Sequence, residues 1–456
     1  MNNKNQCIVR LSVPIWKLTI FLLFISFTFI CFLSASCNNN AGDFPVIPEN
    51  PIGPSSPQPM SEKTAKQYFY DEKIFVGWNL GNTLDALNTW SYRSPKSEET
   101  AWGNPKANQA LFSGIKAQGF NIVRIPITWT GQIGEAPHYQ INEAWLLRVA
   151  EVVGYAHNAG LRVIINMHHD DGFDHGWLLI GKAAANAQEK VRITEKYFKV
   201  WMQIAGFFKN YGDYLIFESM NEVQDGGWGW SGSFRANPKI QIDILNEWNQ
   251  MFTNAVRSSG GNNEKRYLMY PSYASNPEAL LPDGRYAWGP AANQGWDVGK
   301  YFKLPDDSAS GRQIVTFHYY DPQPFHDGVE PNWGTLDEKS AVDNLFARIK
   351  KTYTDNNVPV IIGEIGPTRV SGKLEDGSVM TAAQIAAART SRISWIEYVF
   401  SKAKSIGMIP VYWDNGSFNG SEYSKGQLGI FNRANGQPNS EESAEVIRAM
   451  MRAVGN

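Results

Sequence analysis

The sequence has almost no cysteine and no excess of charge of either sign. Cys7, Cys31 and Cys37 are the only cysteines among 456 residues, so the chain after residue 37 can form no disulfide and offers no thiolate as nucleophile or metal ligand. The 42 Lys and Arg residues are balanced by 44 Asp and Glu residues, for a net charge of −2. Because nucleic-acid binding needs a basic face, we expect no nucleic-acid partner. A mean hydropathy of −0.34 also excludes a polytopic membrane protein.

The one long apolar run lies near the start of the chain. Lys4, Arg10 and Lys17 precede the apolar residues 18–33, which is the order of the charged and hydrophobic regions in a secretory signal. Small residues at 34–36 then lead into Cys37, and this pattern resembles a bacterial lipoprotein signal, whose cysteine is acylated and begins the mature chain. An ordinary signal peptide and an uncleaved anchor helix are the alternatives. We expect residues 1–36 to be a signal peptide and Cys37 to carry a lipid anchor in the cell envelope, at the outer membrane.

Residues 37–60 are rich in Asn, Pro, Gly and Ser, with six prolines between Pro45 and Pro59. Proline fixes φ and cannot donate a hydrogen bond, so we expect this segment to be an extended, solvated tether. No further shift in composition follows. The sequence therefore predicts that residues 61–456 form one folded body.

Eight short apolar runs, rich in β-branched residues, recur at intervals of roughly 40–55 residues. Their nearly continuous hydrophobicity is typical of parallel strands that are buried on both faces. The runs are Phe75–Asn82, Phe120–Trp129, Leu161–His169, Tyr214–Glu222, Arg266–Tyr273, Gln313–Tyr320, Val358–Gly366 and Met408–Gly416.

Helical patterns lie between these runs. Asn142 precedes an apolar stripe that begins at Trp145 and ends before Gly160. Residues 183–210, 240–258, 340–355, 381–405 and 440–454 have similar patterns. Eight alternations of strand and helix indicate an α/β fold, the TIM or (β/α)8 barrel, as a single domain. A doubly wound open sheet is the competing fold, but it does not need eight near-equal units.

Most of the runs turn polar or aromatic at their carboxyl ends. In a TIM barrel these ends surround one opening, where the active site lies. Apolar strands that become polar at the same end predict a single polar site. The residues concerned are Asn82, Arg124, His168, His169, Asn221, Glu222, His318, Tyr320, Glu364 and Trp413.

The segments around these residues resemble glycoside hydrolase family 5, over about residues 66–454. Within the family the resemblance is greatest to the broad-specificity endo-β-1,4-glucanase branch. It implies a retaining β-glycanase that hydrolyses β-1,4-glucan, such as cellulose, mixed-linkage glucan or xyloglucan. It implies no cofactor and no metal, and we expect a monomer. The segments are Gly77-Trp-Asn-Leu-Gly-Asn-Thr-Leu84, Val123-Arg-Ile-Pro126, Asn166-Met-His-His169, Ser219-Met-Asn-Glu222, His318-Tyr-Tyr320, Gly363-Glu364 and Tyr412-Trp413.

The resemblance implies that Glu222 is the general acid/base and Glu364 the nucleophile. Retaining hydrolysis needs two carboxyl groups about 5–5.5 Å apart, and two non-adjacent strands can supply them across the barrel opening. Arg124 and Tyr320 are suited to donate hydrogen bonds to the nucleophile. Asn221 is suited to donate to the sugar 2-hydroxyl.

The other expected substrate-binding residues are His168, His169, His318, Asn82 and Trp413. Trp413 offers a flat apolar face on which a sugar ring can stack, and the resemblance also implies that a cis peptide follows it. Glu218 faces inward four residues before Glu222, and we expect it to be a buried structural acid that pairs with a base. Nine tryptophans lie in loops on the same side of the barrel, and some of them should line sugar subsites: Trp90, Trp102, Trp129, Trp177, Trp228, Trp230, Trp288, Trp296 and Trp333.

Three alternatives remain open for the site. The adjacent pair His168 and His169 could belong to a catalytic zinc site, although metal-dependent barrels use His-x-His, which places both rings on one strand face. The chain could be a noncatalytic glycan-binding surface protein, but that would require the loss of a catalytic carboxylate. Within the same class, a β-1,4-mannanase or xylanase would share the catalytic residues and differ in its loops.

Overall fold

The computed structural model describes residues 44–88, 95–172, 176–226, 232–286, 296–370, 372, 378–418 and 426–455. Residues Val46–Asn456 form one unit. The expected signal peptide and Cys37 lie outside the described residues. Among the helices of the described part, none combines the length and the apolar character that a bilayer-spanning segment requires.

Eight parallel strands close into a barrel in the order β1-β12-β11-β10-β7-β6-β5-β4. Each of the eight expected runs contains one of these strands, which confirms the TIM barrel and excludes the open sheet. The strands are β1 (Gly77–Leu80), β4 (Ile122–Ile125), β5 (Arg162–Ile165), β6 (Leu215–Glu218), β7 (Leu268–Pro271), β10 (Gln313–Tyr319), β11 (Val360–Ile365) and β12 (Met408–Asp414).

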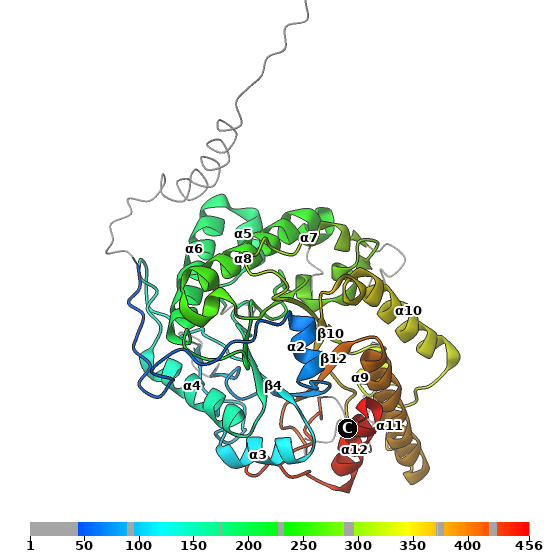
Figure 1. The fold of residues 1–456 in the computed structure, drawn as a ribbon. Helices are drawn as coiled ribbons and strands as arrows, with labels where there is room; N and C mark the ends of the chain where they lie inside the picture. Colours follow the sequence, from blue (N-terminus) through cyan, green and yellow to red (C-terminus); the bar gives the residue numbers. More distant parts are fainter. Residues whose placement is uncertain are drawn as a thin grey trace, which may run out of the picture. The chain divides into compact units, whose positions relative to one another are not determined.

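Helices surround the strands (Figure 1). In α4 the Asn142 side chain accepts a hydrogen bond from the Ala144 N–H, and the stripe that starts at Trp145 is buried, as expected. The long helices are α3 (Gln109–Ala117), α4 (Glu143–Asn158), α6 (Ala187–Phe207), α8 (Pro238–Ser258), α10 (Leu336–Thr352), α11 (Ala382–Ser405) and α12 (Glu441–Val454). The shorter ones are α2 (Ala65–Asp71), α5 (Ile180–Ala185), α7 (Gly232–Ala236) and α9 (Gln323–His326).

The alternation of strand and helix is incomplete after β7. In the described parts of residues 272–312 the chain forms 3₁₀ turns and the short hairpin β8 (Arg285–Tyr286) and β9 (Trp296–Asp297), with no α-helix. Prolines and glycines, among them Pro277, Pro282 and Gly284, interrupt helical hydrogen bonding in this segment. Within the described residues seven long helices follow the eight strands, so the segment after β7 departs from the expected alternation.

Helix α2 closes the amino-terminal end of the barrel, and Figure 1 shows it lying across that end in blue. Ala65, Tyr68 and Phe69 of α2 are buried against inward-facing residues of the strands. This interior layer contains Ile122, Ile164, Ile216, Met269, Ile314, Ile361, Ile409 and Val411. The barrel is therefore filled and sealed at one end, and only the carboxyl end is left to hold a site.

The proline-rich segment differs from the expected solvated tether. From Val46 onwards it lies along the body, where side-chain amides pair with its backbone: Gln140 with Val46, Asn210 with Pro54 and Asn262 with Gln58. An extended chain leaves its N–H and C=O groups unpaired, and these amides satisfy them. We refer to residues 46–61 as the strap. Composition predicts extension but does not reveal the partners on the body.

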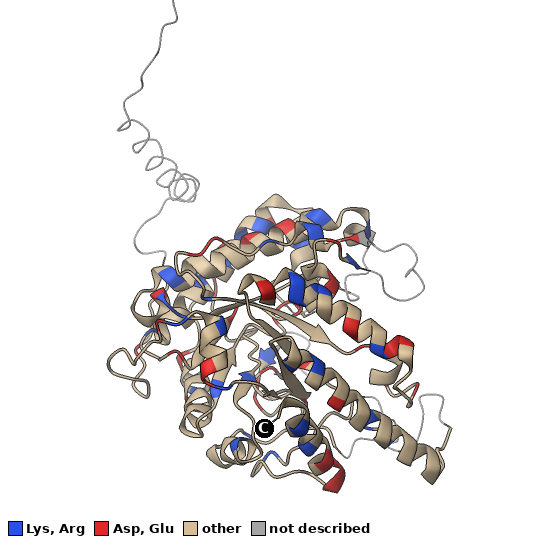
Figure 2. Ribbon diagram, turned by 45° about the vertical axis from the view of Figure 1, so that its right-hand side comes forward, with Lys and Arg blue, Asp and Glu red and all other residues tan. Residues whose placement is uncertain are grey.

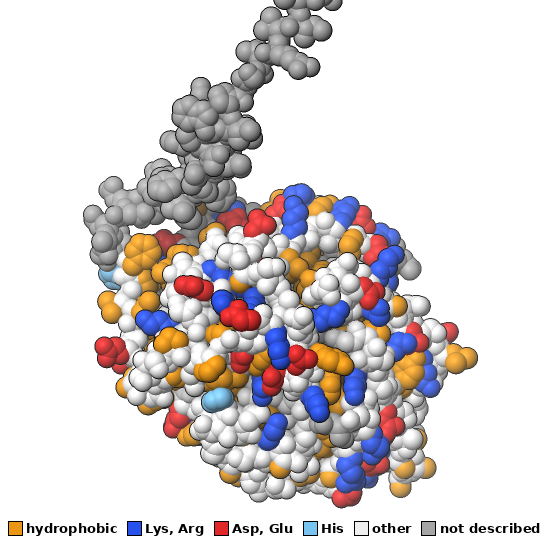
Figure 3. Space-filling view, viewed as in Figure 1, with side chains coloured by type: hydrophobic (Ala, Val, Ile, Leu, Met, Phe, Trp, Pro, Cys, Tyr) orange, Lys and Arg blue, Asp and Glu red, His pale blue; other side chains and the backbone are white. Residues whose placement is uncertain are grey.

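Acidic and basic residues are interspersed along the helices (Figure 2). On the face drawn in Figure 3, hydrophobic side chains are scattered among both kinds of charge. The described residues on that face form no continuous basic area of the kind that binds nucleic acid.

Candidate active site

Arg124 lies at the centre of a buried polar cluster at the carboxyl ends of the strands. Its side chain, on β4, is fully buried and paired with two carboxylates, Glu218 on β6 at 2.7 Å and Glu364 on β11 at 2.8 Å. It also donates to Asn221 Oδ1 at 2.7 Å and to Asn79 Oδ1 at 3.1 Å. Burial alone lowers the pKa of Arg124, but the two carboxylates raise it above its ordinary value. Glu218 is thus the expected structural acid, and Arg124 is the base with which it pairs.

Glu364 is held by donors on both of its oxygens. Oε1 accepts from Arg124, and Oε2 accepts from the Tyr320 hydroxyl at 2.8 Å. His168 Nε2 lies 3.7 Å from Oε1, and the Glu364 side chain is only 7% exposed. A buried carboxylate is stable only when it is paired in this way. Arg124 and Tyr320 therefore donate to Glu364, as expected from the sequence, and His168 lies beside the same carboxylate.

A bulge before Glu364 directs its side chain. In the pairing of β10 with β11, Phe317 faces Ile362 and His318 faces Glu364, so Gly363 is an extra residue. The Gly363 carbonyl accepts from Asn79 Nδ2 at 2.9 Å. A Cβ atom at position 363 would lie only 2.8 Å from the hydroxyl oxygen of Thr316, which is too close for a side chain. The position consequently requires glycine, and the bulge re-aims the residue after it.

Glu222 has a different environment, although it lies close by. Its Oε1 is 2.6 Å from His318 Nδ1. Burial raises the pKa of Glu222 to about 7 and lowers that of His318 to about 3. The Glu222 carboxyl group therefore keeps its proton up to about neutral pH, and this proton lies in the hydrogen bond to the neutral ring of His318. This is the state that a general acid requires.

The two glutamates face one another. One oxygen of Glu222, one oxygen of Glu364 and a ring nitrogen of His318 all lie within 4.8 Å of each other. Carboxyl groups separated by about 5–5.5 Å act by double displacement with retention, whereas inverting enzymes need about 6.5–9.5 Å for an intervening water. The observed separation fits the first arrangement.

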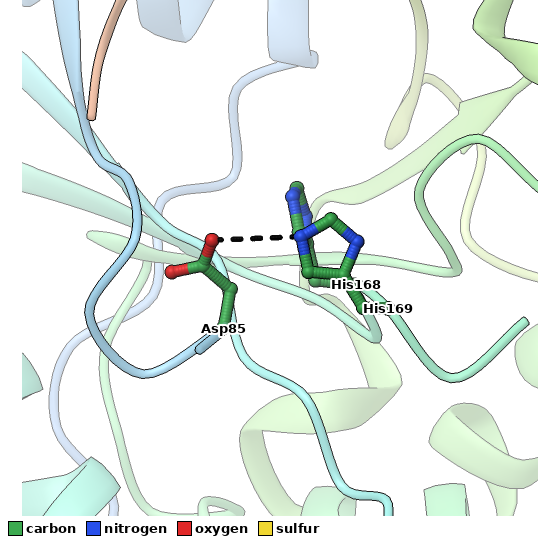
Figure 4. Close-up of side chains that lie close together, drawn as sticks. All are labelled: Asp85, His168 and His169. Atoms are coloured by element: carbon green, nitrogen blue, oxygen red, sulfur yellow. Dashed lines mark ion pairs between the residues drawn. The ribbon is translucent and has the colours of Figure 1, made fainter. Parts of the chain in front are cut away.

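The adjacent histidines have different partners. His169 Nε2 lies 3.7 Å from Asp85 Oδ2, and Figure 4 shows the two groups facing each other with the His168 ring alongside. Asp85 is fully buried and accepts from the backbone N–H groups of Asn82 and Thr83. Burial lowers the pKa of His169, but the hydrogen bond and charge of Asp85 outweigh it and raise that pKa above its ordinary value. Asp85 thus favours the charged form of His169 at the edge of the site.

Two groups of described residues bring metal-type ligand atoms within 4.8 Å of one another: Asp85, His168 and His169, and Glu222, His318 and Glu364. In the first group His168 Nδ1 lies 3.2 Å from the Asn166 amide nitrogen, so its lone pair is used and its hydrogen is on Nε2. In the second group Arg124 and Tyr320 already donate hydrogen bonds to the two oxygens of Glu364. A cation at Glu364 would lie beside the Arg124 guanidinium, and a metal on His168 Nδ1 would displace the Asn166 amide, so both sets already serve other contacts.

Trp413, at the end of β12, lies partly exposed beside the site. Its ring is stacked against that of His168, with centroids 5.7 Å apart and an interplanar angle of 10°. The described residues contain two cis peptide bonds, Ala136–Pro137 and Asp321–Pro322, so the cis bond expected after Trp413 is not found there.

Among the loop tryptophans only Trp102 fits the expected role within the described side chains. It is 41% exposed, and its ring centroid is 5.4 Å from that of His169. Trp129, Trp177 and Trp333 are packed in the interior instead. Trp90, Trp228, Trp230, Trp288 and the side chain of Trp296 lie outside the described part.

Three residues of the cluster were missed by the sequence analysis: Asn79, Asp85 and Asn166. Asn79 faces Arg124 in the pairing of β1 with β4, so a polar residue at an inward strand position was the signal that could have identified it. Asn82, which was expected to bind substrate, lies half-buried just after β1 with φ of 55°. Its backbone contacts Asp85 and Asn104, and its side chain is not part of the carboxylate cluster.

The comparisons with known proteins agree with this site. Residues 84–419 match the family model described as cellulase (glycosyl hydrolase family 5). The chain is 36% identical to endoglucanase B of Clostridium cellulovorans over 84% of this chain and 75% of that protein. A GH5-4 broad-specificity endoglucanase from Bacteroides salanitronis has a TM-score of 0.73 and 36% identity, covering 87% of this chain and 97% of the other. A Bacteroides ovatus GH5 xyloglucanase in complex with a XXXG heptasaccharide has a TM-score of 0.71 and 29% identity, covering 90% and 81%.

A closed barrel with two facing carboxylates at its carboxyl end defines a TIM-barrel glycoside hydrolase. Within that class, the chain belongs to glycosyl hydrolase family 5, the cellulase family.

Proposed function

We propose that the protein is a retaining endo-β-1,4-glucanase in which Glu364 is the nucleophile and Glu222 the acid/base. The observation that carries the proposal is the approach of the two carboxylates to within 4.8 Å, with donors on Glu364 and a raised pKa on Glu222. Glu364 attacks the anomeric carbon while Glu222 protonates the leaving oxygen. Glu222 then removes a proton from water, which releases the sugar from Glu364.

The other residues hold the sugar around this pair. Because Asn221 Oδ1 accepts from Arg124, its amide NH2 remains as a donor for the sugar 2-hydroxyl, a contact that strengthens in the transition state. Trp413 stacks under the ring at the cleavage point, and His169 and Trp102 contact the neighbouring sugar.

Glucan is the preferred backbone in this proposal because the relatives are named as endoglucanases and one structural neighbour is a xyloglucanase. The test is a panel of soluble cellulose derivative, mixed-linkage glucan, xyloglucan, xylan and mannan, with Glu364→Gln as the matched control. We expect new reducing ends from the β-1,4-glucans together with a rapid fall in viscosity, which marks internal cleavage. Cleavage of mannan or xylan, with no cleavage of any glucan in the panel, would favour the mannanase or xylanase alternative. Binding without turnover of any polysaccharide would favour the noncatalytic protein.

We also propose that the protein is exported and tethered through a lipid on Cys37. The charged start of the chain, the apolar residues 18–33 and the small residues before Cys37 support this. Labelling of bacterial cells with a fatty-acid analogue should mark the wild-type protein and leave Cys37→Ala unmarked. Equal labelling of both would contradict the anchor.

A further inference from the structure

Asn166 connects the backbone of one strand end to the buried histidine of the site. Its side chain is 1% exposed; Oδ1 accepts from the Ile127 N–H at 3.1 Å, and its amide nitrogen lies 3.2 Å from His168 Nδ1. A backbone N–H can only donate, so the oxygen of Asn166 must face Ile127 and the NH2 group must face His168. The orientation of this amide is thereby fixed by its partners. His168 Nδ1 must then accept a hydrogen bond and carry no hydrogen.

The single hydrogen of the neutral ring is consequently on Nε2. Burial, with added repulsion from His169 and Arg124, lowers the pKa of His168 well below its ordinary value, so the ring is neutral. Nε2 faces Glu364 Oε1 at 3.7 Å, the same oxygen that accepts from Arg124. The other tautomer would aim a lone pair at this carboxylate.

We propose that Asn166 is a positioning residue that selects the His168 tautomer whose Nε2–H faces Glu364. The proposal rests on the assignment of Glu364 as nucleophile. Negative charge returns to Glu364 when the glycosyl-enzyme breaks down, and a donor aimed at it beforehand costs no reorganisation at that step. The hydrogen bond on one ring nitrogen sets the state of the other.

The kinetic test separates this role from simple support of the fold. Asn166→Ala removes the donor, whereas His168→Gln replaces the ring by an amide N–H that needs no tautomer. We expect Asn166→Ala to lower kcat roughly 10²-fold in the wild type, since a wrong tautomer costs up to about 10⁴-fold in a catalytic triad. In the His168→Gln background the same change should lower kcat less than about threefold, because the two residues act as one unit. Equal losses in both backgrounds would overturn the proposal.

Asn263→Ala is the matched control. This asparagine is fully buried at the opposite end of the barrel, where it donates to the Ala205 carbonyl and accepts from Arg266. Its loss should lower the melting temperature and leave kcat unchanged. If Asn166→Ala does not fold, Asn166→Asp keeps the acceptor for Ile127 and forces a hydrogen onto His168 Nδ1, so it should show the same loss of kcat.

The direct readout is the ¹⁵N spectrum of the intact enzyme with labelled histidine, in which His168→Gln identifies the His168 signals. We expect a protonated Nε2 and an unprotonated Nδ1 in the wild type, and a protonated Nδ1 in part of the Asn166→Ala molecules. A protonated Nδ1 in the wild type, or an unchanged tautomer in Asn166→Ala, would overturn the proposal. Failure of the wild type to cleave any glucan would instead overturn the proposed function, and the spectrum would still decide the tautomer.

Discussion

Each end of the barrel buries an arginine, but the two ends surround it with different groups. At the carboxyl end Arg124 is paired with Glu218 and Glu364. At the amino end Arg266 is just as buried, but it donates to the backbone carbonyls of residues 208, 211, 212 and 215 and to Asn263 Oδ1. The carbonyls cannot change their protonation, so that end supplies only stability. The carboxylates at the other end can act as nucleophile and acid. The burial of an arginine therefore does not by itself identify a functional site, and the groups paired with the arginine must be considered.

The largest expected effect comes from the carboxyl end. Glu364→Gln keeps the size of the side chain and the Arg124–Glu218 pair but cannot form the glycosyl-enzyme, so kcat should fall on the order of 10⁴-fold or more. Polysaccharide binding, measured by affinity electrophoresis, should persist. Retention of more than a tenth of wild-type turnover would mean that another residue is the nucleophile.

The second prediction tests the two arginines against each other. Lysine cannot make the five contacts that the Arg124 guanidinium makes, so Arg124→Lys should lower kcat roughly 10²- to 10³-fold as donors to Glu364 and Asn221 are lost. Arg266→Lys should lower the melting temperature and leave the kcat of the folded protein unchanged. Kinetics and thermal unfolding of both variants check this comparison, and a loss of kcat in Arg266→Lys would break it.

A large part of this comparison could be predicted from the sequence. The apolar runs are long enough to identify every strand, and the polar residues that end them include both carboxylates. The lack of an α-helix in the described residues after β7 does not follow from the strand repeats alone, because it depends on the prolines and glycines between the strands. Asn79, Asp85 and Asn166 were missed because a buried asparagine or aspartate reveals its partner only when two strands are in register. The strap was missed for a similar reason, since its partners lie on distant helices and loops.

The third prediction concerns pH. Near neutral pH we expect a change of protonation at the carboxyl end of the barrel, at Glu222, and none at Arg266 at the amino end. Activity needs the protonated form of Glu222, whose pKa is raised to about 7, so kcat/KM should fall about tenfold per pH unit above pH 7. Burial lowers the pKa of Arg266 to about 9, so this arginine stays charged around neutral pH. A flat profile between pH 7 and 9 would contradict the assignment of Glu222.

The same shift affects stability, and its sign can be worked out. The ordinary pKa of a glutamate is 4.5, and that of Glu222 in the folded protein is about 7. Between these two pH values the unfolded chain has lost a proton that the folded chain retains. Stability therefore falls as pH rises through this window. Glu222→Gln removes the effect, and its melting temperature should exceed that of the wild type most clearly above pH 7. A constant difference across pH 4–8 would contradict the shift.

The smallest expected effect lies at the amino end. The Asn262 amide donates to the carbonyls of Gln58, Asn210 and Tyr211, and so joins the strap to the body. Asn262→Ala should lower the free energy of unfolding by about 1–3 kcal/mol, the usual cost of leaving part-buried carbonyls unpaired. Chemical denaturation measures this cost, and kcat should stay unchanged. A change in kcat would show that the strap influences the site.

The stereochemistry of the first product tests the central claim most directly. Proton NMR of a cello-oligosaccharide digest, recorded before mutarotation, distinguishes the anomer that the enzyme releases. Glu364 attacks the face opposite the leaving group, and water then attacks the face opposite Glu364. These two inversions predict the β-anomer. First release of the α-anomer would show that water attacks directly, and the two carboxylates could not then have the roles assigned to them.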